Sequence, residues 1–321
     1  MQLVVIINSY NRRDLLVQAV GSLVKALGAG PMEYAIVVFE AGSTDGSREW
    51  IVQFAREHRD VSLEVIGALS PRDTSFAAGV NRACQYALEA FPEAEFIFLY
   101  ETDNWLSCAE PVISAIQLLH QEPSLAAMGF TVRLHSGRPC GWGCAFPTVF
   151  SFVIGPQLSM WLGIPRAEVK MRNNDHMKWF AADVVYTSPL LIKASVWKSS
   201  GGIDAQLFPF SDSDLDWAWK VARDGYQLGV LSTDSVVHDN LETLSNWSGM
   251  RVIKFHQGRF RLLRKYRGLG VTLSIPALFL RHFVEYVTLA LMVILGKRPS
   301  LSLEKRAILL KSVWSGYEAA G

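Results

Sequence analysis

Short apolar runs alternate with helical repeats over residues 3–99, and this alternation restricts the fold more than any other feature of the sequence. The apolar runs at 3–7 and 34–39 have the length and composition of buried strands, and residues 62–66 and 95–99 have the pattern of a third and a fourth strand. Helical repeats of apolar residues lie between them, at Asp14–Leu27, from after Ser47 to about Arg56, and at Phe76–Ala90. Strands and helices joined in this order by short turns form βαβ units. We therefore expect an α/β fold with a mostly parallel, Rossmann-like sheet flanked by helices.

Composition limits the classes of partner. The chain has 321 residues, half of them hydrophobic, and its 31 Lys and Arg nearly balance its 30 Asp and Glu. A net charge of +1 gives no overall attraction to nucleic acid, so we expect none as a partner. The four cysteines have no regular spacing, and Met1 runs directly into a strand-like segment. We therefore expect a reducing, cytoplasmic setting.

The regular pattern weakens between residues 129 and 182, which are rich in Gly, Pro and Trp. We interpret this stretch as irregular structure that covers a site. Strand-like residues return at 190–192, and the pattern continues to about residue 240. The sequence therefore predicts one domain over residues 1–240 and a separate C-terminal extension over 241–321.

The C-terminal extension combines basic and apolar segments. Residues 251–267 carry seven Lys and Arg, and residues 271–295 are largely apolar but interrupted by Arg281, His282 and Glu285. A bilayer-spanning helix needs about 20 apolar residues with few charges. The interruptions favour an amphipathic helix on the inner face of a membrane, with peripheral contact through 251–295. The alternative is a helix packed on the protein's own core.

Two acidic residues, Glu101 and Asp103, follow the buried run that ends at Leu99. Residues two apart in an extended loop point the same way, so both carboxylates are expected to face one site. Mg²⁺ and Mn²⁺ prefer oxygen ligands, commonly one or two carboxylates plus substrate phosphates. The pattern predicts a divalent metal beside a diphosphate, although solvated acidic loops have the same appearance.

A second acidic cluster holds Asp212, Asp214 and Asp216, just after Ser211. Ser211 has the chemistry of a helix N-cap, and acids in a first turn suit the helix dipole. Asp212 lies nearest the preceding loop and is our candidate general base. His238 ends another strand-like run and is a candidate metal or phosphate ligand, although a histidine there is commonly structural.

Five motifs in order resemble those of the family 2 glycosyltransferases, which have the GT-A fold. The resemblance covers roughly residues 1–240. The motifs are Val5–Arg12, Glu40–Ser47, Phe76–Arg82, Glu101–Leu106 and the pair Gly201–Asp204 and Ser211–Leu215. The resemblance implies an inverting, metal-assisted transfer of a sugar from a nucleotide-diphosphate donor, UDP- or dTDP-sugar. It also implies a saccharide or lipid-linked saccharide as acceptor, and thus polysaccharide biosynthesis.

The resemblance also implies residue roles. Donor contacts fall on Ser9, Asn11, Glu40, Asn81 and Glu101. Metal contacts fall on Asp103 and His238, and the catalytic base falls on Asp212.

Three positions depart from the family pattern. Glu40 and Glu101 stand where Asp is usual, and Ser211 replaces an acid before the base. These changes keep open a catalytically inactive module that binds nucleotide sugars. A sugar-1-phosphate nucleotidyltransferase is a further alternative, but the turn at 9–14 lacks the glycines of its phosphate loop.

Overall fold

The chain folds into two compact units in the computed structural model, which describes residues 2–30, 32–69, 74–164, 169–174, 177–239 and 249–314. The sheet unit comprises Met1–Cys144 and Ala167–Asn240, and the helical unit comprises Ala145–Arg166 and Leu241–Gly321. The expected boundary near residue 240 lies at a junction of the two units. Residues 145–166 were assigned to the first domain from sequence, but they pack with the C-terminal helices.

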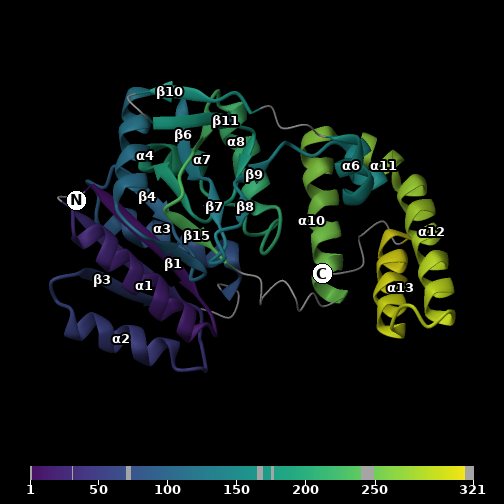
Figure 1. Cartoon of the computed structure of the whole chain (residues 1–321), viewed down its shortest axis with the longest axis horizontal. Coiled ribbons are helices and arrows are strands. Elements are labelled where there is room, and N and C mark those ends of the chain that lie inside the picture. The colour runs from purple at the N-terminus through teal and green to yellow at the C-terminus, as the bar shows by residue number, and fades with distance from the viewer. Residues whose placement is uncertain are drawn as a thin grey trace. The chain divides into compact units, whose positions relative to one another are not determined.

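A nine-stranded mixed sheet forms the centre of the sheet unit (Figure 1). Its strand order is β10-β11-β14-β6-β13-β4-β1-β2-β3. β4, β1, β2 and β3 are parallel neighbours, as the alternation with helices predicts. β13 runs antiparallel between β4 and β6, and β14 is parallel to β6. The strands are β1 (Leu3–Ser9), β2 (Tyr34–Glu40), β3 (Ser62–Gly67), β4 (Phe96–Leu99), β6 (Leu125–Phe130), β10 (Arg172–Asn174), β11 (Met177–Ala182), β13 (Leu190–Lys193) and β14 (Gln227–Leu231).

Helices cover both faces of this sheet, which explains why strands such as β1 and β2 are continuous apolar runs. Alternate residues of β1 and β2, among them Val5, Ile7 and Val38, join one buried cluster with residues of α1, α2 and α4. α3 contacts β1 and β2 from the opposite face. The helices of the unit are α1 (Arg13–Gly28), α2 (Ser47–Glu57), α3 (Phe76–Ala90), α4 (Glu110–Gln121), α7 (Ala194–Ser200) and α8 (Ser213–Arg223).

Two small sheets accompany the central sheet. One has the order β5-β15-β7-β8 and the other pairs β12 with β9. Parts of the stretch that the sequence predicts to be irregular therefore form short strands. The strands are β5 (Asn104–Leu106), β7 (Val132–Arg133), β8 (Pro139–Gly141), β9 (Gly143–Cys144), β12 (Val184–Val185) and β15 (Val236–His238).

The helical unit consists of two short helices from inside the chain and the helices of its C-terminal end. Thr148 caps α5 by accepting from the Ser151 amide N–H, and Ser151 Oγ accepts from the Thr148 N–H in return. The helices are α5 (Val149–Ile154), α6 (Pro156–Leu162), α10 (Gly249–Arg267), α11 (Gly270–Leu273), α12 (Ile275–Ile294) and α13 (Ser300–Trp314). The prediction of a helical C-terminal extension agrees with this unit.

The contact between α3 and β2 requires a glycine. A Cβ at Gly79 would lie 2.8 Å from Phe39 Cδ1, whereas a Cβ at Gly21 in α1 meets nothing within 4 Å. Alanine raises helix propensity equally at both sites. We expect Gly21→Ala to raise the free energy of unfolding by about 0.5–1 kcal/mol. The free energy of unfolding of Gly79→Ala should be about 1–3 kcal/mol lower than that of Gly21→Ala, because the buried ring of Phe39 must shift. Urea denaturation of the two variants measures this difference, and equal stabilities would show that α3 is not held this close to the sheet.

Candidate active site

The first two candidate residues lie side by side where the parallel strands end. Ser9 ends β1 and Glu40 ends β2, and the two are paired in register. Both are buried. The Glu40 carboxylate turns back on its own loop and accepts the backbone N–H groups of Gly42 at 3.0 Å and Ser43 at 2.8 Å. Glu40 thus shapes the turn after β2, a structural role that the motif alone did not indicate.

Asn11 joins the turns that follow β1 and β2. Its backbone N–H donates to Ser43 Oγ at 2.9 Å, and its Oδ1 accepts the Thr44 N–H at 2.7 Å. The residue has φ of 49°, a left-handed conformation that asparagine tolerates better than most residues. Asn11 therefore fixes the shape of both turns at the carboxyl edge, where ligands of open α/β sheets bind.

Asp103 lies at the centre of the candidate site. It follows β4 and is 8% exposed. Arg12 approaches its Oδ2 at 3.4 Å, and His238 Nδ1 approaches its Oδ1 at 3.6 Å. Among the described residues, Oδ1 accepts no hydrogen bond although it is buried. A buried carboxylate oxygen without a donor is costly, so this atom is suited to a ligand that carries positive charge.

The small sheet brings His238 to this position. β15 pairs antiparallel with β5, and the register sets His238 opposite Asn104. His238 Nδ1 lies 2.9 Å from Asn104 Oδ1, while Asn104 Nδ2 donates to the carbonyl of Glu101. An amide oxygen only accepts, so Nδ1 of His238 carries the proton and Nε2 carries the lone pair in the neutral ring. A hydrogen bond of this kind orients metal-binding histidines.

Ser188, in the loop before β13, holds Glu101 beside Asp103. The backbone N–H of Glu101 donates to Ser188 Oγ at 2.9 Å. The antiparallel register of Leu190 with Leu99 accounts for this, because residues two before and two after the pair come opposite each other. Loss of hydration and the charge of Asp103 raise the pKa of Glu101 and Arg12 opposes them, so that the pKa is about 8.

Asn81 projects from α3 to the loop before α8. Its Oδ1 accepts the Ile203 N–H at 2.9 Å, and its Nδ2 donates to the Ile203 carbonyl at 2.7 Å. Gly202 is tight against it, since a Cβ there would lie 2.7 Å from Asn81 Oδ1 and φ is +67°. Asn81 therefore holds the Gly-Gly turn in place, a contact that the predicted nucleoside role did not anticipate.

Asp212 stands at the start of α8 in a left-handed conformation, with φ of 59°. The sequence suggests Ser211 as the N-cap, but the helix begins at Ser213 and Asp212 occupies the cap position without a side-chain cap hydrogen bond. Asp212 is buried, and its carbonyl accepts the Asp216 N–H at 2.9 Å. A residue held in this conformation outside glycine is a strained position of the kind that gathers at functional sites.

The first turn of α8 faces the acids that follow β4. The charge of Asp214 raises the pKa of Glu101 and also that of Tyr186. Asp216 is fully buried. The three acids of the cluster therefore differ. The sequence predicts only a structural role for Asp214, but its charge acts on Glu101 in the candidate site.

The residues present fit a divalent cation with few protein ligands. Asp103 offers a buried oxygen without a donor, and the His238 ring lies beside it. Within the ranges that the structure describes, no group of three His, Cys, Asp or Glu could enclose a metal. A cation held here must take its other ligands from water or from a bound diphosphate, as Mg²⁺ commonly does.

Two contributors to this site were not predicted from the sequence. Arg12 lies in the first motif but was given no role, and it pairs with Asp103. Ser188 bonds Glu101 and Asn104 from the loop before β13, some 85 residues later. Only the pairing of β13 with β4 reveals Ser188, and no local pattern in the sequence predicts that pairing. Arg12 could have been predicted from the sequence, because it is the one cation in the turn between β1 and α1.

Comparisons with known proteins agree with this architecture. The model of the family described as Glycosyl transferase family 2 matches residues 4–107. No curated protein sequence matches the chain.

Three solved structures are similar in fold. The mannosyltransferase PcManGT from Pyrobaculum calidifontis, in complex with GDP-Man and Mn²⁺, has a TM-score of 0.55 and 13% identity, covering 100% of this chain and 88% of that one. GalNAc-T7 with UDP, GalNAc and Mn²⁺ has a TM-score of 0.59 and 12% identity, covering 82% and 47%. TarS of S. aureus has a TM-score of 0.53 and 16% identity, covering 88% of this chain and 44% of its own length.

The matched residues 4–107 contain Ser9, Glu40, Glu101 and Asp103, which stand at the carboxyl edge of β1, β2 and β4. The structural neighbours share the surrounding fold. Residues 4–107 thus match the model of the glycosyl transferase family 2, and the chain shares a GT-A-like fold with these structural neighbours.

Proposed function

We propose that the chain transfers a sugar from a nucleoside-diphosphate sugar to a hydroxyl group of a saccharide or lipid-linked saccharide, with inversion at the anomeric carbon. The observation that carries this proposal is the buried Oδ1 of Asp103, which has no hydrogen-bond donor among the described residues and lies 3.6 Å from His238 Nδ1. The edge of a parallel sheet is where such folds bind nucleotides. Binding of a nucleotide diphosphate with a cation would satisfy this carboxylate.

Asp103 and His238 are the residues that would hold a divalent cation, Mg²⁺ or Mn²⁺. When bound, such a cation offsets the negative charge that builds on the diphosphate as it leaves. The cocrystallised ligands of PcManGT and GalNAc-T7, each with Mn²⁺, support this choice by analogy of fold. We propose UDP- or dTDP-sugar as the donor, with Ser9, Asn11 and Glu40 around the nucleoside.

The side chain of Asp212 is the proposed general base. It takes the proton from the acceptor hydroxyl while the acceptor oxygen bonds to the anomeric carbon. The bond from that carbon to the diphosphate oxygen breaks on the opposite face, and the electron pair leaves with the diphosphate. Burial and the fixed left-handed backbone of Asp212 support a positioned base. A positioned base contributes roughly 10²–10⁴-fold to the rate.

The inactive binding module remains the competing proposal. Release of nucleoside diphosphate from the donor in water separates the two, since an active site of this kind hydrolyses some donor. The cytoplasmic setting on the inner face of a membrane stays a prediction, because nothing in the fold of the sheet unit bears on it.

Replacing Asp103 with Asn should weaken cation-dependent nucleotide binding. The amide keeps the size of the side chain but removes the charge that a cation needs, so the affinity for UDP in Mn²⁺ should fall by about tenfold or more. Isothermal titration with and without Mn²⁺ measures this. Asp60→Asn removes an exposed carboxylate and serves as the matched control. Unchanged affinity in Asp103→Asn would remove the residue from the metal site.

Replacing Asp212 with Asn should lower kcat by about 10²-fold or more and leave the donor KM nearly unchanged. The base acts on the acceptor, and asparagine tolerates a left-handed backbone, so the fold should persist. A steady-state transfer assay on the variant measures both parameters. Asp224→Asn, at the exposed C-terminal end of α8, is the control. A larger loss in Asp214→Asn than in Asp212→Asn would assign the base to Asp214 instead.

A further inference from the structure

Helix α12 is built with its polar side chains inward and its apolar side chains outward. His282 is fully buried, and Arg281 and Glu285 are partly buried. By contrast, 11% of the residues in its most apolar 18-residue stretch are buried. Helices on the surface of proteins in water have the reverse arrangement. The inward polar groups make their contacts inside the helical unit, so the outward face is left exposed.

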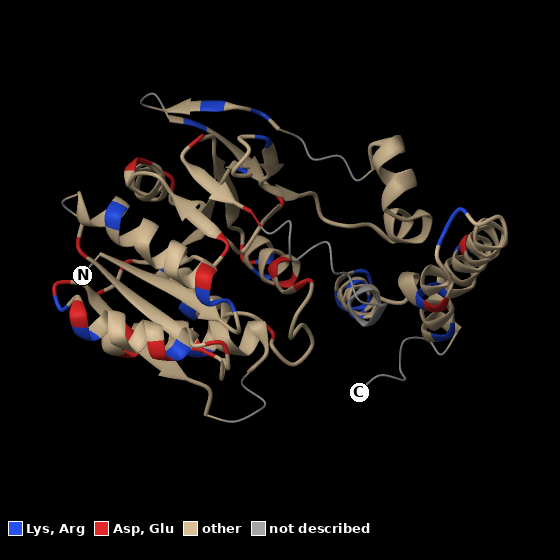
Figure 2. Cartoon of the chain, turned by 60° about the horizontal axis from the view of Figure 1, so that its bottom comes forward, with Lys and Arg blue, Asp and Glu red and all other residues tan. Residues whose placement is uncertain are grey.

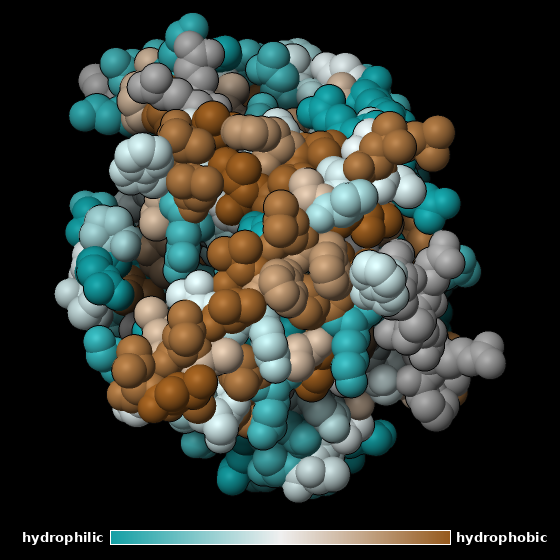
Figure 3. All heavy atoms as spheres, turned by 90° about the vertical axis from the view of Figure 1, so that its right-hand side faces the viewer, coloured by the Kyte–Doolittle hydropathy of each residue, from teal (hydrophilic) through white to brown (hydrophobic). Residues whose placement is uncertain are grey.

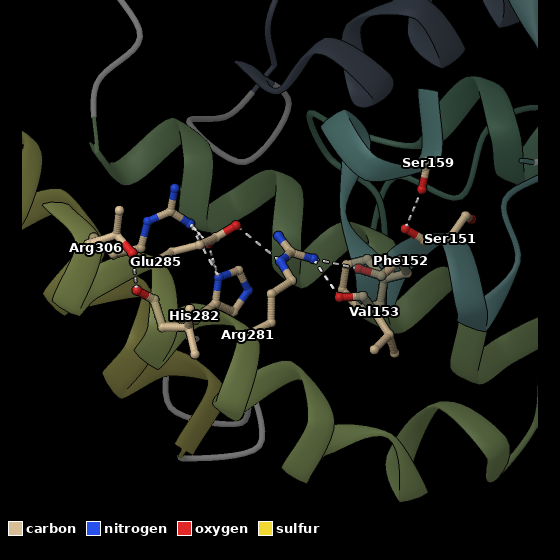
Figure 4. Close-up of polar contacts among 10 residues, drawn as sticks. Ser151, Phe152, Val153, Ser159, Arg281, His282, Glu285 and Arg306 are labelled. Carbon is tan, nitrogen blue, oxygen red and sulfur yellow. Dashed lines mark hydrogen bonds and ion pairs between the residues drawn. The ribbon is translucent and has the colours of Figure 1, made fainter. Parts of the chain in front are cut away.

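The inward groups form one network within the helical unit (Figure 4). Glu285 accepts from Arg281 Nε at 3.3 Å, from Arg306 of α13 at 2.5 Å, and lies 3.0 Å from His282 Nδ1. Arg281 NH1 also donates to the carbonyls of Phe152 and Val153, at 2.7 and 3.0 Å. Those carbonyls belong to the last turn of α5, where no helical N–H reaches them. The network therefore joins α12 to both α13 and α5.

Electrostatics keep the central carboxylate of this network ionised. Burial alone would raise the pKa of Glu285, but the hydrogen bond with His282 and the charges of Arg281 and Arg306 outweigh it and lower the pKa to about 2. His256 of α10 lies edge-on to His282 at 5.0 Å, and burial lowers its pKa to about 3. Glu285 thus remains ionised and paired, and the polar side of α12 is committed to the interior of its own unit.

The opposite side of α12 is an exposed apolar stripe (Figure 3). Its members recur at helical spacing, three, four and seven residues apart. Leu280 is 62% exposed and Ile294 is 80% exposed. The stripe consists of Leu280, Phe283, Val284, Val287, Leu291 and Ile294. A contiguous apolar face of this kind marks contact with a membrane or a protein.

The charge of the helical unit selects between these partners. Its sequence holds fourteen Lys and Arg against four Asp and Glu, a formal charge of +10, whereas the sheet unit has 17 against 26, a charge of −9. Figure 2 marks the Lys and Arg positions in blue on the ribbon. Exposed Arg264, Lys265 and Arg267 stand before the stripe in the chain, and exposed Lys297 and Arg298 follow it. Two units that carry +10 repel each other, so charge opposes pairing of this face with a second copy.

We propose that the apolar stripe of α12 docks on the surface of an anionic lipid bilayer, lying in the interface with the basic residues at both of its ends against the lipid headgroups. A helix with one apolar face and flanking Lys and Arg binds anionic membranes in this manner. α12 is also the one helix among the described residues with the length and apolar content to cross a membrane. Spanning would carry the paired Arg281 and Glu285 into hydrocarbon and separate them from α5 and α13, which interfacial docking does not require.

Flotation of the full chain with lipid vesicles tests the proposal. We expect binding to vesicles of 70% phosphatidylcholine and 30% phosphatidylglycerol at 0.1 M salt, and at least tenfold weaker partitioning into pure phosphatidylcholine. The double variant Leu280→Gln/Leu291→Gln should partition at least tenfold more weakly than the unaltered chain. Both leucines are exposed, so the fold should persist, which circular dichroism checks. Leu69→Gln, an equally exposed leucine of the sheet unit, is the matched control and should bind as the unaltered chain does.

Three outcomes would overturn the proposal. The first is no flotation with anionic vesicles, and the second is equal flotation of the double variant. The third is a dimer without lipid that the double variant abolishes, which would make the stripe a contact between copies. Resistance of the bound chain to extraction by alkaline carbonate would contradict interfacial docking and support a spanning helix. The proposal does not depend on sugar transfer, so a catalytically inactive chain passes or fails the same test.

Discussion

The candidate site depends on one buried carboxylate that three distant segments of the chain surround. Asp103 follows β4, the strand at one side of the parallel group, Arg12 comes from the turn after β1, and His238 comes from a small sheet about 130 residues later in the chain. Removing a carboxylate from water is costly unless charge or hydrogen bonds compensate. Arg12 and His238 compensate in part, and one oxygen is left without a hydrogen-bond donor among the described residues. In our proposal a bound cation would satisfy that oxygen, which connects the fold to the proposed chemistry.

The parallel part of the fold was predictable because its signals are local. β1, β2 and β4 are nearly continuous apolar runs, and the polar residues that follow them mark the edge where ligands of such folds bind. The antiparallel insertion of β13 between β4 and β6 was not predictable, since its pairing is with strands about 90 and 60 residues earlier. Ser188 comes to Glu101 only through that pairing. The same limit applies to Asn81, whose partner Ile203 lies 122 residues away.

The helical unit shows a different limit of sequence reasoning. The interruption of 271–295 by Arg281, His282 and Glu285 is visible in the sequence, but it does not say where those groups point. In the structure these groups contact α5 and α13, and residues 145–166, which include α5, belong to the same unit. A charged side chain that caps the carbonyls of another helix is a tertiary contact with no signature in either segment. The outward apolar stripe follows from that contact, because the polar side of α12 is used internally.

The central claim is that the carboxyl edge of the sheet binds a nucleoside diphosphate together with a divalent cation at Asp103. Thermal unfolding of the full chain with UDP, dTDP or GDP, each with and without Mn²⁺, tests it most directly. The account predicts stabilisation that requires nucleotide and cation together, about 2.7 kcal/mol when the free ligand is at 100 times its Kd. Stabilisation of the same size without the cation, or none with any of the three nucleotides, would contradict it.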